Sequence, residues 1–145
     1  VGGVDSEWAI ENSSQRAANF HPDLVILGFG MNDRCGMEEY RNKTRRLMEA
    51  IRKVSPKTEF LLIASTLPNE LAATEPHHFW AHQDEYSESL KGLEGMGVAI
   101  ADIQAVQKEI GKKKRYIDIT GNWLNHPNDY LARILAQVVI KTLGM

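Results

Sequence analysis

Short apolar runs alternate with longer amphipathic segments along this chain. Three of the runs are almost entirely apolar, over residues 24–29, 59–65 and 98–103. Each has the length of a strand, and each follows a proline or a glycine that interrupts regular structure. Runs of this kind are typical of strands that are buried on both faces of a sheet. We therefore predict three strands with both faces buried.

The segments around these runs have apolar residues at helical spacing. We expect a strongly amphipathic helix over 37–54, a shorter one over 86–93, and a weaker one over 5–20 with Asp5 or Ser6 as its N-cap. A last helix, opening at Pro127, has a wide apolar stripe that predicts burial: Tyr130, Leu131, Ile134, Leu135, Val138, Val139 and Leu143. Buried strands separated by helices predict an α/β domain with a mostly parallel sheet.

Length and charge narrow the classes of protein that this pattern allows. The 145 residues suit a single domain over residues 1–145. The formal net charge of −2 argues against a nucleic-acid partner or an anionic membrane surface, because both need a dense basic patch. The longest apolar run is too short to cross a bilayer, so we expect no membrane span. The only cysteine, Cys35, cannot form an internal disulfide.

Ligands of parallel α/β sheets bind beyond the carboxyl ends of the strands, and the segment 28–33 follows the first predicted strand. A dinucleotide-binding loop is excluded, because Asp33 stands where its third glycine is required. Asn32 offers an amide N–H donor, and Gly30 lets a substrate approach the backbone, as an oxyanion hole requires. The alternative is an Asn-Asp turn that only caps the next helix.

Two further segments contain residues suited to acyl transfer. His126 stands just before Pro127, where a short loop can hold an imidazole as a general base; capping of the last helix is the alternative. Gly3 precedes a helix and can present its backbone N–H to an anion. Its alternative role is a turn that needs a positive φ.

In this order, the three segments resemble the SGNH hydrolases, also called the GDSL esterase/lipase family. Gly3 with its helix is similar to the second block of that family, Gly28-Phe-Gly-Met-Asn-Asp33 to the third, and Asn125-His-Pro-Asn-Asp129 to the fifth. The resemblance covers essentially the whole chain. It implies a flavodoxin-like parallel sheet flanked by helices in three α/β/α layers.

The resemblance also implies an activity. Gly3 and Asn32 would donate hydrogen bonds to an oxyanion, and His126 would activate a serine that attacks a small-molecule ester. The substrate would be a small acyl ester, with an acetylated carbohydrate as the favoured class, and no metal or organic cofactor is implied.

The chain departs from the family in two places. It begins with Val1 and a glycine pair, at the second block, so we expect a processed chain or a fragment whose first strand and nucleophilic serine lie upstream. Ser6 is not assigned as the nucleophile, because no strand precedes it. Trp123 stands three residues before His126, where the family usually has an aspartate. Another group is then expected to orient the imidazole, either a backbone carbonyl near Asn122 or Trp123 or a carboxylate from elsewhere in the chain.

Loss of that first strand would leave an apolar sheet edge along residues 24–29. A bare edge invites pairing with another chain, so we expect self-association through it.

Three other interpretations stay open. A non-catalytic α/β binding module would keep the oxyanion pocket and lack the nucleophile. Cys35 could replace the serine, although such small buried cysteines are usually inert. His77, His78 and His82 could bind Zn²⁺ on a helix, but no carboxylate or cysteine completes the set. A simpler interpretation of residues 76–82 is an aromatic loop at the substrate cleft.

Overall fold

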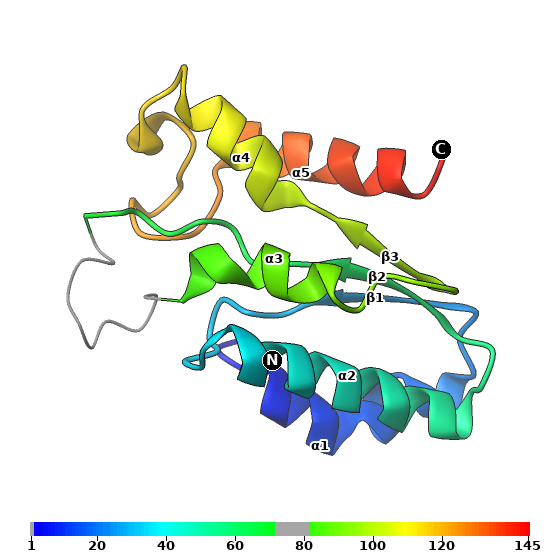
Figure 1. Cartoon of the computed structure of the whole chain (residues 1–145). Helices are drawn as coiled ribbons and strands as arrows, with labels where there is room; N and C mark the ends of the chain where they lie inside the picture. Colours follow the sequence, from blue (N-terminus) through cyan, green and yellow to red (C-terminus); the bar gives the residue numbers. More distant parts are fainter. Residues whose placement is uncertain (1, 72–81) are drawn as a thin grey trace.

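The computed structural model describes residues 2–71 and 82–145 (Figure 1). Within these residues one parallel sheet has the strand order β1-β2-β3, formed by β1 (Leu24–Gly28), β2 (Glu59–Ile63) and β3 (Val98–Ala101). Leu24 lies opposite Glu59, and Phe60 lies opposite Val98. The predicted parallel α/β arrangement is confirmed, and the carboxyl ends of the strands share one edge of the sheet.

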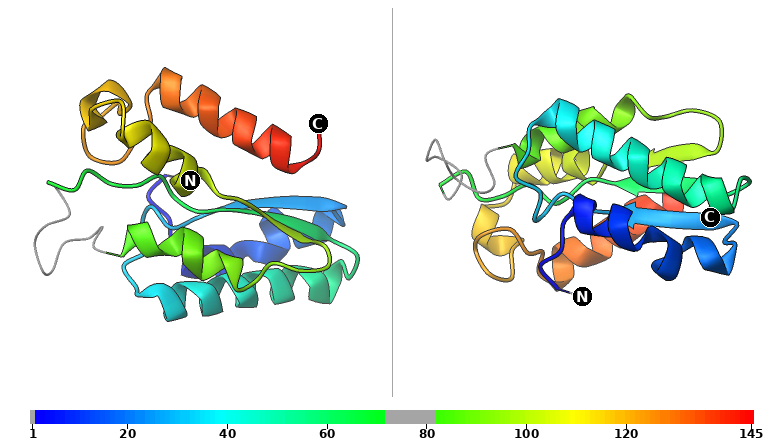
Figure 2. Two further views of the ribbon diagram at one scale, coloured as in Figure 1. Left: turned by 45° about the horizontal axis from the view of Figure 1, so that its top comes forward. Right: turned by 90° about the horizontal axis from the view of Figure 1, so that it is seen from below.

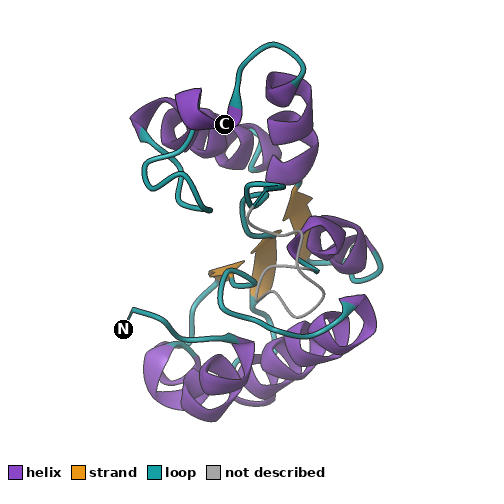
Figure 3. Ribbon diagram, turned by 90° about the vertical axis from the view of Figure 1, so that its left-hand side faces the viewer, coloured by secondary structure: helices purple, strands orange, loops and turns teal. Residues whose placement is uncertain are grey.

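Helices cover both faces of this sheet. The α-helices of the described residues are α1 (Ser6–Arg16), α2 (Met37–Val54), α3 (Tyr86–Lys91), α4 (Ile103–Gly111) and α5 (Asp129–Thr142). The short 3₁₀ turns are η1 (Ala18–Phe20), η2 (Gln83–Glu85) and η3 (Tyr116–Asp118). Figures 1 and 3 show α1, α2 and α3 on one side of the sheet and α4 and α5 on the other. This is the three-layer arrangement that the resemblance implies.

The main core lies between the sheet and the layer of α1, α2 and α3. Alternate side chains of the strands point into it, and helix α2 contributes residues spaced three and four apart. The almost fully enclosed members are Tyr40, Ile51, Phe60, Leu62, Tyr86 and Leu90. The rings of Tyr40 and Tyr86 stack with their centroids 3.9 Å apart, which adds to the attraction expected from buried area alone. The helix predicted over 37–54 is confirmed.

The prediction that the first strand is buried on both faces is wrong. Leu24 and Ile26 are 41% and 50% exposed, and both point away from the main core, because Val25 and Leu27 point into it. β1 is an edge strand, and α5 packs against β3 at the opposite edge. In Figure 2, α5 runs on the side of the sheet away from α1 and α2. An apolar run is therefore compatible with an edge strand that is covered on only one face.

The prediction for the last helix is also wrong in two respects. Of its apolar stripe only Leu131 is buried. The helix begins at Asp129 rather than at Pro127, with the Asn128 side chain accepting the backbone N–H of Leu131. Pro127 instead forms a bridge with Thr120. The first helix agrees better with expectation, because Asp5 is its N-cap and accepts the N–H of Trp8.

Candidate active site

The loop that follows β1, residues 29–35, lies at the carboxyl edge of the sheet and contains Asn32. Gly30 has a φ of 113°, and a Cβ there would lie 2.9 Å from the Tyr86 ring. This position therefore needs glycine for both its backbone angle and its close packing. The loop consequently has one well-defined path over the core.

Buried polar side chains from three other elements bond the carbonyl groups of this loop. Tyr40 donates to Phe29, Gln83 to Gly30 and Met31, and Tyr86 to Cys35, at distances of 2.9, 3.0, 2.6 and 2.7 Å. Gln104 holds Gln83 in turn, donating to its carbonyl oxygen at 2.6 Å and to that of Ser65 at 2.9 Å. Because these donors are themselves enclosed, the loop is rigid before any substrate binds, as electrostatic stabilisation of a transition state requires.

Asp33 joins this loop to the start of α1. Its buried carboxylate accepts the backbone N–H of Gly30 at 3.1 Å and that of Ser6 at 3.2 Å, and it also accepts the Ser6 hydroxyl. A carboxylate at a helix N-terminus is favoured by the helix dipole. The segment before α1 and the loop after β1 are therefore held side by side.

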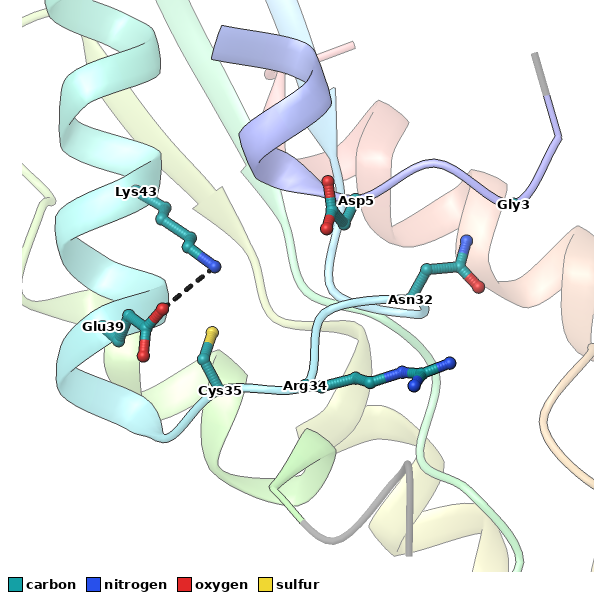
Figure 4. A pocket seen from close by; sticks show the side chains of 7 residues that line it. All are labelled: Gly3, Asp5, Asn32, Arg34, Cys35, Glu39 and Lys43. Atoms are coloured by element: carbon teal, nitrogen blue, oxygen red, sulfur yellow. Dashed lines mark ion pairs between the residues drawn. The ribbon is translucent and has the colours of Figure 1, made fainter. Parts of the chain in front are cut away.

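Gly3 and Asn32 meet as a result of this junction. The Asn32 amide donates to the Val4 carbonyl at 3.0 Å, and the described residues offer no partner to its second N–H. Gly3 has a φ of 76°, and its backbone N–H also has no partner in the described part of the chain. Both residues line one pocket of about 420 Å³, where Figure 4 shows the Asn32 amide directed toward the Gly3 segment. Two N–H donors of the kind an oxyanion needs are therefore available there.

The rest of this pocket is polar. Asp5, Arg34, Cys35, Glu39 and Lys43 complete its lining. The Lys43 ammonium lies 3.1 Å from Glu39. Burial disfavours its charge, but the hydrogen bond with Glu39 and the charges of Cys35, Glu39 and Asp33 together outweigh burial and raise the pKa of Lys43.

Cys35 is a poor candidate nucleophile in this setting. Burial is the main cause that raises the pKa of its thiol, and the thiol lies 4.0 Å from the Tyr86 hydroxyl. A raised pKa keeps the sulfur protonated near neutral pH. The Ser6 hydroxyl is buried against Asp33, in agreement with leaving Ser6 unassigned.

The loop that leads into α5, residues 121–128, lies at the same edge of the sheet (Figure 1) and is separate from the loop of Asn32. His126 belongs to this second loop. Neighbouring loops bond the carbonyl groups just before it: Thr66 donates to Asn125 at 2.6 Å, and the backbone N–H of Asn69 donates to Leu124 at 2.7 Å. The imidazole is exposed, and no group in the described residues forms a hydrogen bond with it. His126 is not among the residues that line the pocket of Gly3 and Asn32.

The other predicted candidates are placed as follows. His77 and His78 lie outside the described residues, whereas His82 is half exposed and its Nδ1 lies 3.5 Å from a Glu85 carboxylate oxygen. The described residues contain no cluster of three groups that could hold a metal ion. No helix among them is both long and apolar enough to cross a membrane.

Sequence reasoning missed the glutamines that support the site. Gln83 and Gln104 are almost fully buried, and Gln107 bonds both the N–H and the carbonyl group of Leu67, at 2.8 and 3.2 Å. A signal was present in the chain: Gln104 and Gln107 are three residues apart at the start of α4, on its buried side. Polar residues on the buried side of a helix that follows a strand indicate bonds to neighbouring loops.

A family model described as GDSL-like lipase/acylhydrolase matches residues 2–134. No curated protein matches the chain significantly. Solved structures with the same fold include a protein described as a GDSL-like lipase from Parabacteroides merdae, with a TM-score of 0.81 and 18% identity over 98% of this chain and 69% of that one.

Two further solved structures are carbohydrate esterases by their descriptions. An acetylxylan esterase from Geobacillus stearothermophilus matches with a TM-score of 0.80 and 19% identity, over 99% of this chain and 69% of that one. A carbohydrate esterase family 3 protein from Talaromyces cellulolyticus matches with a TM-score of 0.72 and 17% identity, over 97% and 67%. In the acetylxylan esterase, catalytic mutants replace a serine, a histidine, and an aspartate three positions before that histidine.

Proposed function

The chain belongs to the GDSL-like lipase/acylhydrolase family, and on this basis we propose that it provides His126, Asn32 and Gly3 to a serine esterase that cleaves small acyl esters. The observation that carries the proposal is the shared pocket of Gly3 and Asn32, where each residue has an N–H without a partner in the described residues. A fold-level likeness alone would not support a reaction. Two donors held side by side by a rigid loop do support one.

The reaction follows the two-step path of acyl-enzyme chemistry. A serine oxygen attacks the ester carbonyl carbon, while His126 takes the hydroxyl proton and then gives it to the leaving alcohol. Water, deprotonated by His126, releases the acyl group in the second step. The negative charge on the carbonyl oxygen is stabilised by the N–H groups of Gly3 and Asn32, at about 3 kcal/mol for each donor.

The nucleophilic serine in this proposal comes from outside the 145 residues. Ser6 and Ser65, the serines nearest the candidate site, are both buried, and the Ser6 hydroxyl is engaged by Asp33. The solved neighbours extend beyond the matched region, since this chain covers 69% of the first of them.

The favoured substrate class is an acetylated carbohydrate. The pocket beside the two donors has carboxylate, ammonium and guanidinium groups rather than an apolar lining, which suits a polar group better than a long acyl chain. Two structural neighbours are described as carbohydrate esterases.

A non-catalytic binding module is the second candidate function. Two observations favour it. The imidazole of His126 has no partner in the described residues, and Trp123 stands where the acetylxylan esterase has a catalytic aspartate. Such a module would bind an acylated sugar in the same pocket without cleaving it.

The test uses the full-length protein, including any residues that precede Val1. A fluorophosphonate probe should label one serine upstream of Val1, and His126→Ala should lower hydrolysis of p-nitrophenyl acetate and acetylated xylooligosaccharide by about 1,000-fold or more. His21→Asn is the matched control, because His21 is exposed, has a φ of 47° that asparagine tolerates, and lies outside the candidate site. Activity retained in His126→Ala would overturn the mechanism. Absence of both labelling and hydrolysis in the unmodified protein would favour the binding module.

A further inference from the structure

The loop that carries His126 is built around a single side-chain oxygen. Asn122 Oδ1 accepts the backbone N–H groups of Leu124, Asn125 and His126 at 3.0, 3.0 and 2.9 Å. The backbone N–H of Gly121 donates to the His126 carbonyl at 2.8 Å and closes the loop at its base. Six residues thus form a closed loop with one carboxamide oxygen at its centre.

Trp123 shows that this loop has an unusual backbone. Its φ is 62°, in the left-handed region that bulky side chains rarely adopt and that costs free energy. Its indole ring is half exposed, so burial of the ring does not repay that cost. Two sets of interactions hold the backbone in this conformation: the three bonds to Asn122 within the loop, and a bond from the Asn69 side-chain amide to the Trp123 carbonyl at 2.9 Å.

The consequence concerns His126 directly. The third of the bonds to Asn122 reaches its own backbone N–H, and Gly121 and Thr120 bond its carbonyl group, so the backbone of His126 is restrained on both sides. An aspartate three residues before a catalytic histidine orients the ring itself; in this chain that position is Trp123. Asn122 instead bonds the backbone N–H of His126, and so restrains the backbone that carries the ring and not the ring itself.

We propose that Asn122 is a positioning residue for His126, holding its backbone in the place from which the imidazole reaches the reacting ester. The proposal rests on the proposed esterase function for its catalytic meaning. The structural part of the proposal, that Asn122 holds three backbone N–H groups and thereby positions the imidazole of His126, can be tested whether or not the protein is an esterase.

Two variants of Asn122 separate the role of the oxygen from the size of the side chain. Asn122→Leu has a similar volume and no acceptor, whereas Asn122→Asp keeps an oxygen in the same position. Asn42→Leu is the matched control, since Asn42 lies on the exposed face of α2 and, among the described residues, its side chain bonds Arg45 alone. Hydrogen exchange of the three amides and ¹⁵N signals of the His126 ring are measured on the 145-residue chain. The kcat and KM for p-nitrophenyl acetate are measured on the full-length protein.

We expect Asn122→Leu to speed exchange of the three amides about ten-fold or more, because their acceptor is lost, and to alter the His126 ring signals. We expect its kcat to fall by about 100-fold with KM within about two-fold, as misplacement of a catalytic group predicts. Asn122→Asp and Asn42→Leu should stay close to the unmodified protein in every measurement.

Unchanged exchange and ring signals in Asn122→Leu would overturn the proposal, and so would faster exchange with an unchanged kcat, which would show a merely structural role. A loss of kcat in Asn122→Asp as large as in Asn122→Leu would also overturn it. If the unmodified full-length protein hydrolyses no ester, the proposed function fails. The exchange and ring measurements then decide alone whether Asn122 positions His126.

Discussion

The two faces of the sheet are covered to different extents. Under α1, α2 and α3 the inward side chains of all three strands join one core, with Tyr40, Ile51 and Leu90 almost fully enclosed. On the other face, α5 packs against β3 and Leu61 of β2 is fully enclosed, but Leu24 and Ile26 of β1 are left open. The first face therefore provides most of the stabilising burial of the described residues.

The same difference separates the two halves of the candidate site. The loop of Asn32 lies over the packed face and is bonded by enclosed side chains of α2, α3 and η2. The loop of His126 leads into α5 on the open face, and its residues 121–124 and 126 are exposed, whereas Asn125 is buried. The loop of Asn32 is thus supported by side chains of the core. The loop of His126 depends on bonds within the loop and on bonds from Thr66 and Asn69.

The largest expected effect compares one buried position on the packed face with one position on α5. Leu47→Ala should lower the free energy of unfolding by about 3 kcal/mol, because Leu47 is 3% exposed and its loss leaves a cavity. Ile140→Ala should lower it by less than about 1 kcal/mol, since Ile140 is 48% exposed. Urea unfolding of both variants gives the comparison.

Similar losses in the two variants would contradict the difference between the faces. They would show that the α5 face is covered in solution. Unfolding should then be repeated at several protein concentrations. A midpoint that depends on concentration would show that association between chains covers the α5 face, because unfolding of a monomer has a midpoint independent of concentration.

A second prediction concerns the open edge of β1. We expect the 145-residue chain to self-associate, because an apolar edge strand presents unpaired backbone groups to other chains. Ile26→Lys should shift the population toward the monomer, since a charge on an edge strand disfavours pairing. Light scattering measures both proteins. A monomeric unmodified chain would refute the prediction.

The smallest expected effect is a pH dependence at the junction of α3 and α4. Asp102 caps α4; burial opposes its charge, but the Ser87 hydroxyl, the Ala105 N–H and Lys91, 3.2 Å away, together hold its pKa below the ordinary value. A depressed pKa in the folded state contributes stability that is present above the unfolded pKa of about 4 and is lost as pH falls through the folded pKa.

Asp102→Asn removes this contribution and keeps a good helix cap. Because the pair is partly exposed, we expect the difference in unfolding free energy to be below about 1 kcal/mol at pH 7 and to shrink as pH falls through the folded pKa. Urea unfolding from pH 2 to pH 7 tests this. A constant difference over that range would assign the effect to packing instead of charge.

Several features of the fold could be predicted because they depend on nearby residues. The strands near 24, 59 and 98, the α2 helix and the Asp5 cap all follow from periodicity and capping within a few residues. Gly3 and Asn32 could be named as candidates because Gly3 precedes a predicted helix and Asn32 follows a predicted strand. The structure adds that Asp33 joins the two segments, a contact between residues 27 apart that no local pattern indicates.

The order and type of the elements thus follow from the local pattern of the chain, because backbone preferences and side-chain spacing act within a turn or two. Burial does not, because an apolar position is enclosed only when another segment covers it. Leu61 and Ile26 lie opposite each other in neighbouring strands, yet Leu61 in the central strand is fully enclosed while Ile26 in the edge strand is half exposed. Tertiary contacts alone decided that difference.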